Sequence, residues 1–78
     1  MTQRPLLAQD LERVLAQDLE RARADYGTAC ARYNKAYRQE RSERYLRLLA
    51  SRAESALDAL HYAERMWSIH VLREAELI

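Results

Sequence analysis

The sequence predicts an all-α protein, an antiparallel helical hairpin of two long helices, and three observations favour this fold. Strong helix formers such as Ala, Leu, Arg and Glu dominate a chain with one Gly, one Pro and no Phe. Apolar residues recur at helical spacing along most of the chain. One polar segment near mid-sequence, residues 38–44, interrupts that spacing. The 78 residues suffice for one domain, so we expect a single helical domain over residues 1–78.

The first helix is expected over about residues 5–39. Pro5 suits a first helical turn, where its missing N–H costs nothing. We interpret Gly27 as an interior helical glycine, because the apolar stripe passes through it in phase. The stripe consists of Leu7, Leu11, Leu15, Ala22, Tyr26, Ala29, Tyr33, Ala36 and Tyr37, with Val14, Leu19 and Cys30 at its flanks.

The chain is expected to reverse at about residues 39–43 and to form a second helix over about 42–77. Ser42 can cap that helix at its N-terminus. The alternative is a three-helix bundle broken near Gly27 and Ser51, because Ser51 and Glu54 have the spacing of a capping box. A two-helix hairpin has one shared seam and no enclosed core, so we expect it to need a dimer mate or another partner.

The second helix carries two apolar stripes in its C-terminal half. One continues in phase from Leu46 and Leu49 and is predicted to pack against the first helix, although Glu64 interrupts it. It consists of Leu57, Leu60, Trp67, Val71 and Ile78. The other has no counterpart within the chain, and we predict that it binds a partner. It consists of Tyr62, Met66, Ile69 and Leu77, with Trp67 as a further candidate contact.

Charge is concentrated at the expected turn. Residues 32–52 hold seven basic and two acidic residues, whereas residues 1–31 and 53–78 have net charges of −1 and −3. We define the basic pole by the four arginines nearest the turn: Arg38, Arg41, Arg44 and Arg47. Because tyrosines interleave with these cations, a dimeric four-helix bundle that binds RNA is the alternative function. Three-residue spacing scatters the cations around a helix, which favours the interpretation as a solvated end.

No pattern in the sequence indicates catalysis, a cofactor or a metal site, so we expect a protein that is not an enzyme. His61 and His70 are nine residues apart, on opposite sides of one helix, and cannot share a metal ion within one chain. We expect His70 and Glu74 to form a surface hydrogen bond. Cys30 is the only cysteine and no apolar run reaches the ~20 residues of a membrane span. Without a recognisable signal peptide, the expected location is the cytoplasm.

The start of the second helix resembles a family of small secretion proteins. The residues that carry this resemblance are Tyr45, Leu48, Leu49, Ala53, Ala56, Leu57 and Leu60. In size and helical-hairpin form the chain resembles the needle-protein co-chaperones of type III secretion. The resemblance implies a role in joining a helical-repeat chaperone and keeping the needle subunit from polymerising. We therefore predict a non-enzymatic helical-hairpin adaptor or co-chaperone that binds another helical protein, or a homodimer.

Overall fold

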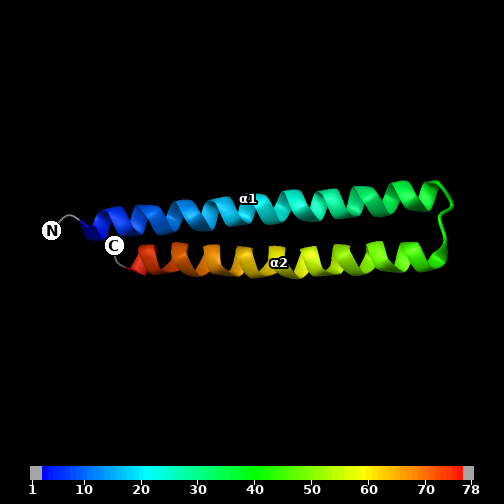
Figure 1. Ribbon diagram of the computed structural model, residues 1–78. Helices are drawn as coiled ribbons and strands as arrows, with labels where there is room; N and C mark the ends of the chain where they lie inside the picture. The colour runs from blue at the N-terminus through cyan, green and yellow to red at the C-terminus, as the bar shows by residue number, and fades with distance from the viewer. Residues whose placement is uncertain (1–2, 77–78) are drawn as a thin grey trace.

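The computed structural model describes residues 3–76, and side chains from residue 9, as two long helices joined by a short turn (Figure 1). Helix α1 spans Gln3–Arg38 and α2 spans Glu43–Glu76. They lie antiparallel in a rod with extents of 59 × 19 × 14 Å. The predicted helical hairpin is confirmed. The three-helix alternative is wrong, because α1 continues through Gly27 and α2 continues through Ser51.

Helix α1 ends in a Schellman motif that reverses the chain. The Arg41 N–H donates to the Ala36 carbonyl at 3.1 Å, and the Glu40 N–H donates to the Tyr37 carbonyl at 3.1 Å. Glu40, two residues after the end of α1, has a φ of 55°, the left-handed conformation that this motif requires one residue past the helix cap. Glycine usually occupies that position, because a side chain there is strained. The turn therefore forms from backbone hydrogen bonds without its preferred residue.

Helix α2 begins at the cap that the sequence predicts. The Tyr45 N–H donates to Ser42 Oγ at 3.2 Å, and the Leu46 N–H donates to the Ser42 carbonyl at 3.0 Å. These bonds satisfy backbone donors that the first helical turn leaves without partners. Arg47 also pairs with Glu43 at 3.1 Å, but both side chains are highly exposed. An ion pair this exposed contributes little to stability.

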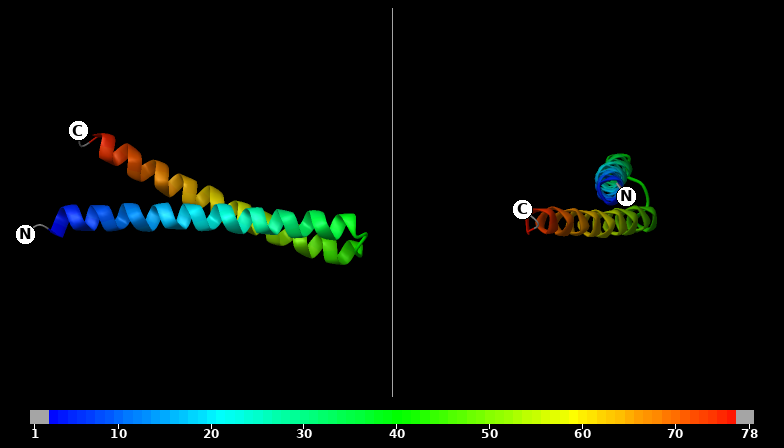
Figure 2. Two further views of the ribbon diagram at one scale, coloured as in Figure 1. Left: turned by 90° about the horizontal axis from the view of Figure 1, so that it is seen from above. Right: turned by 90° about the vertical axis from the view of Figure 1, so that its left-hand side faces the viewer.

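The seam between the helices follows spacings that alternate between three and four residues. This 3.5-residue average is the repeat of a coiled coil, in which two helices cross at a shallow angle. Figure 2 shows α2 crossing α1 and separating from it sideways toward the end where α1 starts and α2 stops, which we call the open end. The buried and half-buried seam residues are Leu15, Leu19, Ala22, Tyr26, Ala29, Tyr33 and Ala36 on α1, and Leu46, Leu49, Ala53, Ala56, Leu60, Ala63, Trp67 and His70 on α2.

The seam has few large buried side chains. Leu19, Ala22 and Ala63 form its buried cluster, against which Leu60 and Trp67 pack. No large side chain is fully buried in the part of the chain that the structure describes. Small alanines allow the helices to approach closely, but they remove little apolar area from water. The hairpin is therefore held by one narrow line of contacts.

Among the residues whose side chains the structure describes, which exclude Leu7 and Ile78, the predicted stripes were wrong in three places. Leu11 and Tyr37 were expected against α2, and Val71 against α1, but all three are exposed. Glu64 is exposed as well, so it lies beside the seam and does not interrupt it. The reason is phase: the alternation of three- and four-residue spacings, continued from Leu49, selects Ala63 and His70, and neither of these is a large apolar residue.

Candidate protein-interaction surface

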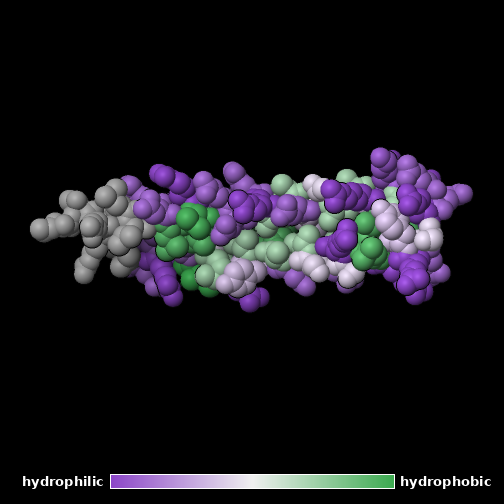
Figure 3. All heavy atoms as spheres, viewed as in Figure 1, coloured by the Kyte–Doolittle hydropathy of each residue, from purple (hydrophilic) through white to green (hydrophobic). Residues whose placement is uncertain are grey.

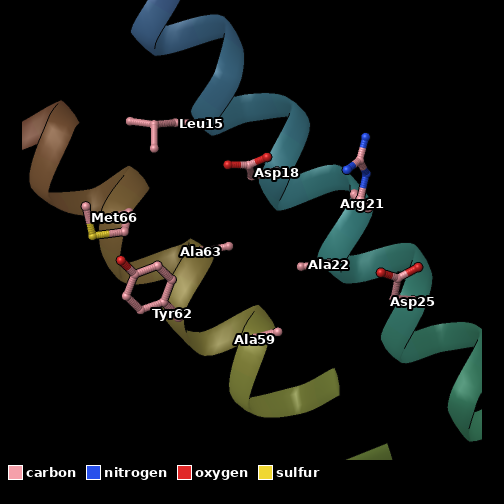
Figure 4. A pocket seen from close by; sticks show the side chains of 9 residues that line it. All are labelled: Leu15, Asp18, Arg21, Ala22, Asp25, Ala59, Tyr62, Ala63 and Met66. Atoms are coloured by element: carbon pink, nitrogen blue, oxygen red, sulfur yellow. The ribbon is translucent and has the colours of Figure 1, made fainter. Parts of the chain in front are cut away.

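A groove of about 390 Å³ runs between the helices in the half of the hairpin nearer the open end. Its floor is the seam itself, where Ala22 and Ala63 leave space that larger side chains would fill. The wall on α1 carries Asp18, Arg21 and Asp25. Figure 4 shows the Asp18 side chain pointing toward α2, those of Arg21 and Asp25 lying along α1, and Leu15 near one end of the groove. We call this feature the alanine groove; its lining is Leu15, Asp18, Arg21, Ala22, Asp25, Ala59, Tyr62, Ala63 and Met66.

Two of the predicted partner-binding residues form the α2 wall of the alanine groove. Tyr62 is 64% exposed and Met66 is half-buried, and Figure 4 shows both side chains on the same stretch of α2. Ile69 is 37% exposed and lies seven residues after Tyr62, close to two helical turns, so it extends that wall toward the open end. The structure thus brings Tyr62, Met66 and Ile69 together on one side of α2.

The other two predicted contacts fall elsewhere. Trp67 is half-buried and packs against the cluster of Leu19, Ala22 and Ala63, so it belongs to the seam. Its indole ring therefore stabilises the hairpin and is only partly available to a partner. Leu77 lies outside the residues that the structure describes.

Helix α1 adds two exposed apolar residues that the partner-binding prediction missed. Leu11 and Val14 are 51% and 50% exposed. Each lies seven residues before a groove residue, Asp18 and Arg21 respectively, so each projects from the groove side of α1. The seven-residue spacing is present in the sequence. It identifies Leu11 and Val14 only once the seam residues, and with them the groove side of α1, are known.

Apolar atoms gather between the helices toward the open end (Figure 3). We call this surface the groove face, and define it as the alanine groove together with Leu11, Val14 and Ile69. Single exposed apolar residues are ordinary on proteins, whereas a contiguous set beside a groove marks a binding surface. Neither helix, over its described residues, contains a stretch apolar enough to span a bilayer.

Comparison with protein-family models, curated proteins and solved structures finds no match for this chain.

The four arginines of the basic pole lie at the end of α1, in the turn and in the first turns of α2. All four arginines are exposed. Arg47 is paired with Glu43, and the Arg41 guanidinium lies 4.5 Å from the centre of the Tyr45 ring. A second hollow, of about 260 Å³, has two cations in its lining that do not belong to the basic pole, Arg32 and Lys35. Its lining is Arg32, Lys35, Ala36, Gln39, Arg41 and Tyr45. Only Arg41 of the predicted pole contributes to this hollow.

The only cysteine lies on the opposite side of the seam from the alanine groove. Cys30 is half-buried and lines a shallow hollow with Tyr33 and Ala53. A hydrogen bond between the Tyr26 and Cys30 side chains, followed by the charge of the thiolate, raises the pKa of Tyr26 above its usual value. The Tyr26 hydroxyl therefore stays protonated at neutral pH, as tyrosines ordinarily do.

Three further side chains, each with a nitrogen or oxygen atom that could bind a metal ion, converge at the open end of the seam. They are Glu12 from α1 with His70 and Glu74 from α2. The expected surface hydrogen bond between His70 and Glu74 does not form. His70 Nε2 lies 3.3 Å from Glu74 Oε1 but is buried without a hydrogen-bond partner. The sequence could not bring Glu12 to His70, because the two are 58 positions apart and only the hairpin register joins them.

Proposed function

We propose that this chain is a non-enzymatic protein-interaction module that binds an amphipathic helix of another protein on the groove face. The observation that carries the proposal is the gathering of four exposed apolar residues along one groove. They come from both helices: Leu11, Val14, Tyr62 and Ile69. A helix laid in such a groove buries apolar residues at spacings of three and four. Because the seam of the hairpin is narrow, burial of apolar surface against the partner would also increase the stability of the folded chain.

The charges of the groove specify the partner further. Asp18 and Asp25 lie on its α1 wall with Arg21 between them, whereas the α2 wall is apolar. No ion pair joins α1 to α2 among residues 9–76, so neither aspartate is neutralised from the other helix. An amphipathic helix with Lys or Arg beside its apolar stripe would complement both walls. A co-chaperone role of the kind found in type III secretion would be one instance of this function.

A photocrosslinking amino acid placed at position 69 or 71 in living cells tests the proposal. Ile69 lies on the groove face, whereas Val71 is similarly exposed, at 44%, but points about 200° away around α2, off that face. We expect position 69 to crosslink to a distinct protein and the matched position 71 to give little product. Adding Tyr62→Glu to the position-69 chain should abolish the product. Equal crosslinking at both positions, or none at position 69, would refute the proposal.

The second candidate function, nucleic-acid binding, rests on the hollow between Arg32, Lys35 and Arg41 beside the turn. Three cations around one hollow could hold a phosphate group, and the Tyr45 ring at its edge could stack on a base. The candidate predicts retention on immobilised RNA that falls steeply with salt and weakens in Lys35→Gln. Passage through the RNA column at low salt would eliminate it.

A further inference from the structure

The open end of the seam holds two carboxylates and an imidazole where the rest of the seam holds apolar residues. Glu12 lies three residues before Leu15, and Glu74 lies four residues after His70, so both continue the alternating spacing of the seam. The ligand atoms of Glu12, His70 and Glu74 all lie within 4.8 Å of one another. Two carboxylates this close repel each other unless a positive charge lies between them.

His70 supplies the second, independent observation. Its side chain is only 10% exposed. The Nε2 atom is buried, lies 3.3 Å from Glu74 Oε1 and has no hydrogen-bond partner. Trp67 lies against the imidazole, with the two ring centres 6.1 Å apart, and holds it in the seam. A buried polar atom without a partner is unfavourable, which indicates that something else satisfies this nitrogen.

The distance between His70 and Glu74 fits a shared metal ion better than a hydrogen bond. Nε2 and Oε1 are 3.3 Å apart without the alignment that a hydrogen bond needs. Two ligands of a tetrahedral ion with bonds of about 2.0–2.1 Å are separated by about 3.3–3.4 Å. The i,i+4 spacing places both side chains on one side of α2, and Glu12 approaches from α1.

We propose that Glu12, His70 and Glu74 form a Zn²⁺ site that joins the helices at the open end, with water as the fourth ligand. Imidazole nitrogen and carboxylate oxygen are ligands that zinc accepts in tetrahedral geometry. Ca²⁺ and Mg²⁺ bind through oxygen alone and would leave His70 Nε2 unsatisfied. The ion would neutralise both carboxylates and fix the helices where the apolar seam runs out.

Thermal unfolding of the full chain, followed by far-UV circular dichroism with and without ZnCl₂, tests the site. Zinc that binds the folded chain should raise the melting temperature. His70→Gln should abolish the rise, and Glu12→Gln should weaken zinc affinity by at least about 100-fold, since losing even an outer partner of a ligand costs 10- to 100-fold. His61→Gln is the matched control, because His61 is exposed on the same helix, away from the site.

The outcomes are distinct. A rise in melting temperature that survives in His61→Gln and disappears in His70→Gln and Glu12→Gln supports the site. Co²⁺ should then give the strong visible absorption of a tetrahedral ion, at one ion per chain. If His70→Gln fails to fold without metal, Glu12→Gln decides, because the Glu12 side chain is exposed and its loss leaves the seam intact. No rise in the wild type, or an equal rise in Glu12→Gln, would overturn the proposal.

Discussion

Replacing Gly27 with alanine should stabilise the hairpin, because this glycine lies within α1 and uses none of its conformational freedom. Its φ is not positive. A Cβ built on Gly27 would meet no heavy atom within 4 Å, so the added methyl group causes no clash. Alanine is favoured over glycine in a helix interior by about 0.8–1.0 kcal/mol. Nothing in the surroundings opposes this gain, so the whole of it should appear as increased free energy of unfolding.

The size of this effect is measurable by thermal unfolding. A gain of 1 kcal/mol raises the melting temperature of a 60- to 100-residue domain by about 4–8 °C. Ala31→Gly is the reciprocal control, because Ala31 is also exposed in α1 and should lose a similar amount. If the chain instead broke at Gly27 with a left-handed residue there, alanine would destabilise it. A lowered melting temperature in Gly27→Ala would therefore refute the continuous helix.

Three other predictions follow from the turn and the seam. Glu40→Gly should raise the free energy of unfolding by about 1 kcal/mol in urea titrations, because glycine relieves the strain of the left-handed residue; a loss would contradict the Schellman turn. Leu19→Ala should cost about 2–3 kcal/mol, whereas Leu72→Ala should stay within about 0.5 kcal/mol, since only Leu19 is buried; equal losses would show a different seam. Glu43→Gln should change stability by less than about 0.5 kcal/mol in low and high salt, because its pair with Arg47 is exposed; a larger loss would show that the pair is not solvated.

The fold could be predicted because its signals are local. Helix-forming composition, one polar interruption and the capping serine are read over a few residues each, and Ser42 does cap α2. The turn itself was inferred only from polarity, because its left-handed residue is Glu40 and not glycine. No residue type marks such a turn, so its Schellman bonds were not predictable.

The contacts between the helices were harder to predict, because they depend on phase over many turns. Assigning Val71 to the seam in place of His70 rotates the predicted seam by one position. Ala63 is not predicted as a seam residue either, because a stripe of large apolar residues does not include it. The same shift concealed the contribution of Leu11 to the groove face. Glu12 and His70 could not be joined at all without the register of the hairpin, which no short segment of sequence contains.

The central claim is that the groove face of the folded hairpin is open to another protein. Light scattering on the isolated chain, wild type and Ile69→Glu, tests this most directly. An open face predicts that both chains have the mass of one copy, near 9.2 kDa, and that without a partner their helices are only marginally stable, because the seam is narrow. A wild-type dimer that Ile69→Glu returns to monomer would show that a second copy covers the face, and would contradict the claim.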